Sequence, residues 1–231
     1  MAKKKKEQQA ADQIENVQNA ISKSEAFIEK YQNQLLYGVL AIVVLVLAVL
    51  AFRNYYVAPK QQEAQAQLSV GERYFAVDSF KVALEGNGID YIGFKEITEQ
   101  YRITDAANVA TVYAGISCFK LGQYKEAIKY LKKFDRNGDV NVTPMVLGLT
   151  GDSYVELGEV DKGIKFFLKA AKKDNPQLSP IYLKKAGIAY ESKGEYGKAV
   201  EMYTQIKDKY FKSNEAQDIE KYIERANALI K

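Results

Sequence analysis

The sequence predicts an all-α protein, in which an N-terminal amphipathic helix and one transmembrane helix precede a solenoid of helical hairpins that ends in a capping helix. Two observations predict this class. Residues 35–52 are apolar without interruption, and a glycine-containing segment occurs three times at a spacing of 36 residues. An apolar run of this length suits a bilayer, and a repeat of this length suits one pair of helices per copy.

The composition of the 231 residues excludes many kinds of chemistry. Histidine and tryptophan are absent and Cys118 is the single cysteine, so histidine-based catalysis and an internal disulfide are unavailable. The net charge of +4 is spread over 33 basic and 29 acidic residues, which does not favour nucleic-acid binding. We therefore predict that the chain is not an enzyme and has no cofactor, metal site, nucleic-acid partner or small-molecule substrate.

The apolar run from Leu35 to Phe52 predicts an uncleaved transmembrane anchor. As a helix it would span roughly 27 Å, which is enough to cross the hydrocarbon core of a bilayer. The alternative is a cleaved signal peptide, with a cleavage site near Ala51. A partly acidic leader of 34 residues and an apolar run longer than that of a signal peptide favour the anchor.

Residues 1–34 precede the anchor and carry a run of lysines, Lys3 to Lys6. Lysines on one side of an anchor resist translocation, so the N-terminus is predicted to be cytosolic. The leader also has apolar residues at helical spacing, which predict an amphipathic helix packed either on a partner or on the membrane surface. These residues are Ile14, Val17, Ile21, Ile28 and Tyr31.

The repeat is the most specific signal in the chain. The segments 119–128, 155–164 and 191–200 align, and seven residues before the glycine of each lies another glycine on the same period. Each copy predicts a helix, a short turn that contains the second glycine, and a second helix. The residues assigned to packing within and between the copies are Gly115, Gly122 and Ala127, then Gly151, Gly158 and Gly163, then Gly187, Gly194 and Ala199.

The first glycine of each copy lies inside a helix, where glycine is unfavourable by about 1 kcal/mol relative to alanine. We therefore expect a close approach of the neighbouring helix at this position. Leu131, Phe167 and Tyr203 are predicted to fill the space between repeats. A single hairpin cannot bury both of its faces, so the copies should stack into one solenoid.

The flanks of the three repeats complete the predicted solenoid of nine helices. Residues 53–107 contain a linker, in which Pro59 ends the membrane helix, and a degenerate first hairpin. That hairpin has helices over residues 60–84 and 91–101, joined by a turn at residues 86–88. Residues 211–231 are predicted to cap the last hydrophobic face, with Ile219, Tyr222, Ile223 and Ala226 on one side of a helix.

In residues 108–210 the glycine spacing, Tyr124 and Tyr196 after the turn, and the small residues that follow resemble the tetratricopeptide repeat. The resemblance implies a concave binding face formed by the first helix of each hairpin. Carried over to this sequence, that face would consist of Val112, Ile116 and Phe119, then Gly148, Asp152 and Val155, then Lys184, Ile188 and Glu191. Its ligand is expected to be an apolar or amphipathic protein segment, unless a neighbouring helix occupies the groove.

Three further features have simple structural interpretations. Cys118 occupies a core position of the repeat, which predicts an inert buried thiol. Residues 135–139 contain acidic residues and a glycine but lack the spacing of a calcium loop, so they predict a turn. The only carboxylate pair that could support hydrolysis is Asp152 with Glu191, and no nucleophile, metal site or phosphate loop accompanies it.

The architecture of nearly the whole chain resembles the YfgM family of ancillary Sec translocon subunits. The resemblance implies a single-pass protein of the bacterial inner membrane with a cytosolic N-terminus and a periplasmic repeat domain. Its implied partners are the translocon channel, a membrane-anchored prolyl isomerase and unfolded secreted chains, which it would hand to periplasmic chaperones. The alternative is a scaffold subunit of another envelope complex for secretion, division or wall synthesis.

Overall fold

The computed structural model describes residues 30–34, 36–135 and 139–230. The chain divides into two compact units, Met1–Ala58 and Pro59–Lys231, hereafter unit 1 and unit 2. The predicted amphipathic helix of the leader lies almost entirely outside the described residues.

The described part of unit 1 is an apolar helix with exposed side chains. A helix between Lys30 and Ala76 contains an 18-residue window with a mean hydropathy of 3.0, and none of that window is buried. Leu40 and Leu45, for example, are 56% and 64% exposed. The core helix of a globular protein would bury such residues, so the apolar window of this helix has no packing partner among the described residues. It is long and apolar enough to cross a membrane.

Pro59 does not end the helix, contrary to the prediction. A π-helical turn, η1 (Arg53–Val57), precedes it, and α2 (Ala58–Ala76) begins one residue before the proline. Proline cannot donate a backbone hydrogen bond and its ring crowds the preceding turn, and a wider π-helical turn accommodates both effects. The division between the two compact units nevertheless falls at this proline.

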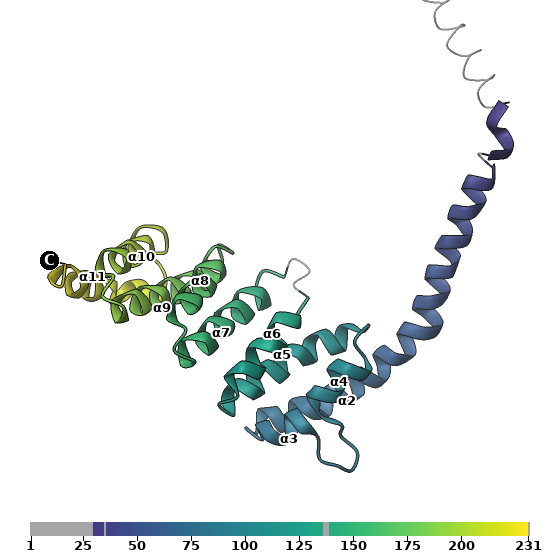
Figure 1. Cartoon of the computed structure of the whole chain (residues 1–231), viewed down its shortest axis with the longest axis horizontal. Coiled ribbons are helices and arrows are strands. Elements are labelled where there is room, and N and C mark those ends of the chain that lie inside the picture. The colour runs from purple at the N-terminus through teal and green to yellow at the C-terminus, as the bar shows by residue number, and fades with distance from the viewer. Residues whose placement is uncertain (1–29, 35, 136–138, 231) are drawn as a thin grey trace, which may run out of the picture. The chain divides into compact units, whose positions relative to one another are not determined.

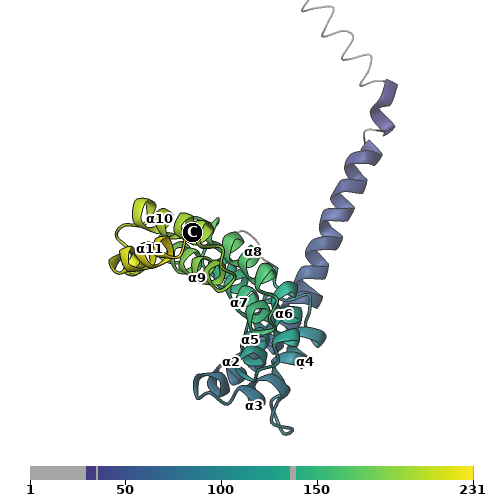
Figure 2. The same cartoon turned by 60° about the vertical axis from the view of Figure 1, so that its left-hand side comes forward.

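Unit 2 is a solenoid of helical hairpins (Figure 1), and its described residues contain no strand. After α2 follow α3 (Phe80–Glu85), α4 (Gly93–Gln100), α5 (Asp105–Lys120), α6 (Tyr124–Lys133), α7 (Val142–Glu156), α8 (Val160–Ala171), α9 (Ser179–Ser192), α10 (Tyr196–Lys209), the 3-10 turn η2 (Asn214–Gln217) and α11 (Ile219–Ala228). Helices contact mainly their neighbours along the chain, as in a stack of repeats. The helices α6, α8 and α10 follow one another on one side of the stack (Figure 2).

The second glycine of each repeat supplies a left-handed backbone at the end of the first helix. Gly122, Gly158 and Gly194 have φ angles of 72°, 75° and 75°. The amide that follows each glycine donates back to the helix, as from Gln123 to the carbonyl of Cys118 at 2.8 Å. This is the Schellman arrangement, which favours glycine at this position. These glycines therefore form the turn, as predicted. A side chain there would meet no atom within 4 Å, so they do not pack against a neighbouring helix, and their assignment to packing was wrong.

The first glycine of each repeat lies at a tight helix crossing, as predicted. A Cβ atom on Gly115 would lie 2.6 Å from Leu131, and one on Gly187 would lie 2.3 Å from Tyr203. A Cβ on Gly151 would lie 2.7 Å from the ring of Phe167. The helices of each hairpin can therefore approach closely only because these positions carry no side chain.

The first hairpin differs from the prediction because its long helix is interrupted. The chain turns at Asp78, whose φ is 57°, and the amide of Ser79 donates to the carbonyl of Tyr74 at 3.0 Å. This is the same end motif as in the repeats, with aspartate in place of glycine. As a result, the described residues of unit 2 form ten α-helices where nine were predicted.

The cores of the solenoid lie entirely within unit 2. One cluster joins α2, α3, α4, α5 and α6, and includes Phe94 and Ile97, which are both fully buried. The other joins α7 to α11, and includes Tyr203 and Ile206. The last helix buries Ile219 and Ala226 in this second cluster, with Tyr222 and Ile223 partly buried, which is the packing expected of a cap. Because none of the described residues of unit 1 belongs to either core, unit 2 has what it needs to fold alone.

Candidate functional site: an apolar groove on the first helices of the repeats

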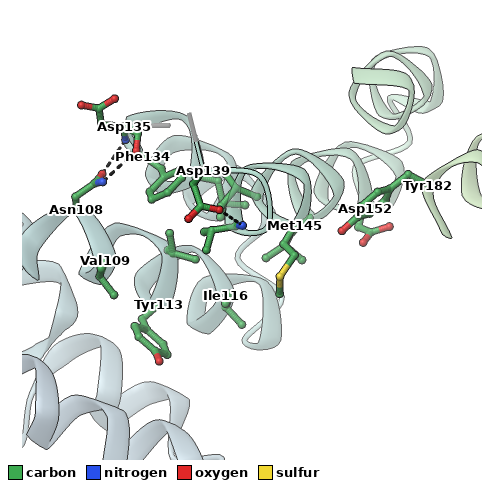
Figure 3. Close-up of a pocket in the computed structure, with 15 residues that line it drawn as sticks. Asn108, Val109, Tyr113, Ile116, Phe134, Asp135, Asp139, Met145, Asp152 and Tyr182 are labelled. Carbon is green, nitrogen blue, oxygen red and sulfur yellow. Dashed lines mark hydrogen bonds between the residues drawn. The ribbon is translucent and has the colours of Figure 1, made fainter. Parts of the chain in front are cut away.

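A groove of about 820 Å³ lies between α5 and α7 and is closed at one end by Tyr182 of α9 (Figure 3). Its lining residues are Asn108, Val109, Val112, Tyr113, Ile116, Leu131, Phe134, Asp135, Asp139, Val142, Met145, Val146, Leu149, Asp152 and Tyr182. Most of them are apolar. Because the groove lies along the first helix of two hairpins, it corresponds to the concave face of a solenoid.

Solvent-exposed apolar side chains form the floor of the groove. Val109 is 40% exposed and Met145 is 52% exposed, and Ile116 and Leu149 are half-buried beside them. Tyr113 closes the other end, where its ring stacks on that of Phe94 at 5.0 Å between centroids. Grouped apolar side chains that remain exposed in a solenoid mark a surface for another molecule.

Acidic residues border this apolar floor (Figure 3). Asn108 and Asp135 are joined by two hydrogen bonds, in which the Asn108 amide donates to the Asp135 carbonyl at 3.0 Å and accepts from the Asp135 backbone amide at 2.7 Å. The Oδ1 of Asp139 accepts hydrogen bonds from two backbone amides at the start of α7. Asp152 forms a salt bridge of 2.6 Å with Lys185. None of the described residues that line the groove is basic.

The structure brings only part of the predicted concave face into this groove. Val112, Ile116 and Asp152 line it. Gly148 instead lies beneath Tyr182, where a Cβ would be 1.9 Å from the ring. Phe119 packs edge-on against Tyr124, with ring centroids 5.4 Å apart.

The remaining predicted groove residues also contact other parts of unit 2. Val155 packs on Gly163 inside its own hairpin, where a Cβ on that glycine would be 2.5 Å away. Lys184 forms a 2.8 Å salt bridge with Asp218, which lies at the start of the cap. Ile188 is 45% exposed and lies in a separate shallow depression that Lys184 and Asp218 also border.

Glu191 faces the capping helix. It accepts a hydrogen bond from the Tyr203 hydroxyl at 2.9 Å and forms a salt bridge of 2.8 Å with Arg225 of α11. At the third repeat, therefore, residues of the cap occupy much of what was predicted as the concave face. Asp152 and Glu191 have separate partners, so the structure does not bring this pair together in one cleft.

Two rows of the face were missed by the sequence prediction. Val109, Met145 and Ile181 share one position of the 36-residue period, and Tyr113, Leu149 and Lys185 share another. The sequence contained a signal for the first row, because its residue is apolar in all three copies. These residues point away from the glycines that pack each hairpin. One residue along a helix rotates a side chain by about 100°, so a small error of register selects a different face.

Cys118 is buried as predicted, with 1% of its surface exposed. Burial raises the pKa of its thiol to about 11, so little thiolate forms at neutral pH. Residues 136–138 of the acidic turn lie outside the described residues.

Comparisons with known proteins agree with this geometry. The family model described as a tetratricopeptide repeat matches residues 114–136. A putative kinesin light chain of Podosopora anserina with TPR-like repeats is 12% identical, covers 73% of this chain and 87% of its own, and has a TM-score of 0.55. The crystal structure of MamA is 18% identical, covers 72% of this chain and 91% of its own, and has a TM-score of 0.53. No curated protein matches the chain in sequence.

At these identities the likeness to solved structures concerns the fold. Together with the matched repeat at residues 114–136, the fold defines the class: unit 2 is an all-helical solenoid with a TPR-like fold. Solenoids of this class present extended concave surfaces to protein partners.

Proposed function

We propose that the chain is a membrane-anchored adaptor that binds an amphipathic protein segment in the groove of unit 2. The observation that carries this proposal is the exposed apolar floor of the groove, with acidic residues at its border. Such a surface suits a helix whose residues at positions i, i+3, i+4 and i+7 are apolar and form one stripe. Basic residues beside that stripe would face the acidic border.

The energetics favour an apolar contact assisted by charge. Burying Met145 and Val109 under a ligand removes apolar surface from water, which contributes roughly 25 cal/mol for each Å². Asp135 and Asp139 lie at the border, where complementary charge orients a ligand and raises its association rate more than its affinity. The apolar stripe should therefore determine affinity, and the basic flank should determine orientation.

Defined peptides test this proposal on residues 59–231. A fluorescent helical peptide with leucine on one face and lysine elsewhere is expected to bind, with fluorescence anisotropy as the measurement. A peptide of the same composition with scrambled order lacks the stripe and should bind far more weakly, and a leucine–glutamate peptide should not compete with the leucine–lysine peptide for the groove. Equal binding of the scrambled peptide would contradict the proposal.

We further propose that the apolar helix of unit 1 crosses the bacterial inner membrane, with the N-terminus cytosolic and the repeats periplasmic. The exposed apolar surface of residues 36–52 supports the membrane crossing. The lysines at positions 3–6 support the orientation. A reporter that is active only outside the cytoplasm, fused after Lys231, should be active. If this fusion is silent while the same reporter fused to a known periplasmic protein is active, the orientation is the opposite of the one proposed.

The finer proposal is that the partners are the Sec translocon and periplasmic chaperones that receive secreted chains. Its support is the resemblance of the chain's architecture to the YfgM family, since apolar segments of unfolded secreted chains suit an exposed apolar groove. Purification in mild detergent should recover translocon channel subunits. Recovery of another envelope assembly without those subunits would replace this proposal by the scaffold alternative.

A further inference from the structure

The outer face of the first two repeats, opposite the groove helices, is strongly basic. Helix α6 carries four lysines and one glutamate, and residues 160–173 carry five lysines and one aspartate. These two segments have an excess of seven positive charges, compared with +4 for the whole chain. The nine lysines, all exposed, are Lys125, Lys129, Lys132, Lys133, Lys162, Lys165, Lys169, Lys172 and Lys173.

Helical spacing places these lysines on a common face of each helix. In α6 they occur at steps of four, three and one residues, and in α8 the steps of three and four give the same result. The opposite side of each helix carries the buried residues, such as Leu131 in α6 and Phe167 in α8. The third repeat does not continue this row of lysines. Position 201, which is equivalent to Lys165 in the 36-residue period, is a glutamate.

Two stacked aromatic rings connect the lysines of α6 with those of α8. Tyr154 and Phe166 stack at 5.4 Å between centroids. The ammonium group of Lys132 lies 5.2 Å from the first ring and 5.9 Å from the second, and it also donates a hydrogen bond to the Tyr154 hydroxyl at 2.7 Å. Lys169 lies 5.1 Å from the ring of Phe166. The two lysine stripes therefore form one continuous surface.

Most of this charge is not neutralised by carboxylates in the part of the chain that the structure describes. Glu126 pairs with Lys129 and Glu159 pairs with Lys162, both at exposed i, i+3 positions. Among the described residues, no carboxylate forms a salt bridge with Lys132, Lys165 or Lys169. Like charges held this close repel one another, so an external anionic surface would stabilise the arrangement.

We propose that this outer face binds the surface of a bilayer that contains anionic lipids. The inference rests on the proposed membrane anchoring, because only six residues separate the end of the apolar run at Phe52 from Pro59, where unit 2 begins. Such a short connection limits how far unit 2 can move from the headgroups. Lysine clusters next to a transmembrane helix bind anionic headgroups through summed Coulomb attraction. With the outer face on the lipid, the groove faces away from it, open to a partner.

Vesicle binding by residues 59–231 tests this inference without the anchor. The unit is expected to float with vesicles of phosphatidylglycerol and phosphatidylcholine at low salt and to dissociate at high salt, because exposed charges are screened. Vesicles of phosphatidylcholine alone should not bind it. The variant K129Q/K132Q/K165Q/K169Q is expected to bind at least about 100-fold more weakly, since each lysine near such a surface contributes roughly fivefold.

A matched variant, K81Q/K95Q/K212Q/K221Q, loses the same charge at exposed positions elsewhere and should bind within a few-fold of the wild type. Circular dichroism checks that both variants remain folded. Equal loss in both variants, or equal binding to neutral vesicles, would overturn the inference. Strong binding to soluble heparin but not to vesicles would assign the face to an anionic polymer instead. A negative vesicle result leaves the reporter-fusion test of the anchor unaffected, so the two proposals fail separately.

Discussion

Replacement of Gly151 by leucine is expected to lower the free energy of unfolding of residues 59–231 by about 3 kcal/mol, the upper end of the usual cost of overpacking. A Cβ at this position would lie 2.7 Å from the ring of Phe167 and 3.1 Å from the carbonyl oxygen of Gly163. The ring is buried and the carbonyl is backbone, so neither can move without shifting α8. For a domain of this size the loss corresponds to a fall in Tm of roughly 6–12 °C.

The control for this prediction is the same substitution at Gly197, in the first turn of α10. A side chain there would meet no atom within 4 Å, and leucine favours a helix more than glycine does, so G197L should not lower Tm. A second comparison is I223A in the capping helix, where the side chain is only partly buried. Because Gly151 lies between two neighbouring repeats and the cap has one, G151L should cost more than I223A. Equal loss of Tm for G151L and G197L would show that Gly151 is not at a tight crossing.

Replacement of Met145 by lysine is expected to weaken binding of the leucine–lysine peptide by at least about tenfold, which corresponds to 1.4 kcal/mol. Met145 is 52% exposed on the floor of the groove, so the free protein tolerates a lysine there. A bound apolar stripe would desolvate the ammonium group without a partner, and the basic flank of the peptide would repel it.

The control at this position is M145L, which conserves volume and apolar character and should bind like the wild type. The measurements are fluorescence anisotropy for binding and thermal unfolding for stability. An unchanged Tm with weaker binding would assign the effect to the groove. Unchanged binding by M145K would place the peptide on another surface.

The sequence by itself determined the repeat and its helical hairpins. The glycines at a period of 36 residues are visible without a structure. Gly151 and Gly158 illustrate the two local requirements that glycine meets. The first is a crossing too tight for a side chain, and the second is a left-handed turn. The apolar run at residues 35–52 is equally visible, since its composition alone suits a membrane.

The tertiary structure decided which face of the hairpins stays open. Met145 and Leu149 line the groove, whereas the predicted Gly148 and Val155 lie under Tyr182 and against Gly163. The period fixes a position within the repeat but not the direction in which its side chain points, and neighbours one residue apart differ by about 100°.

The covering of the concave face at the third repeat by the cap also depended on contacts between residues far apart in the sequence. Glu191 and Arg225 are 34 residues apart and meet only when α11 packs on the last hairpin. The break at Asp78 was likewise decided by packing, because aspartate adopts a left-handed backbone only where the surrounding chain makes the turn favourable. Local propensity and period thus determine the hairpins, and long-range packing determines the surface that they leave for a partner.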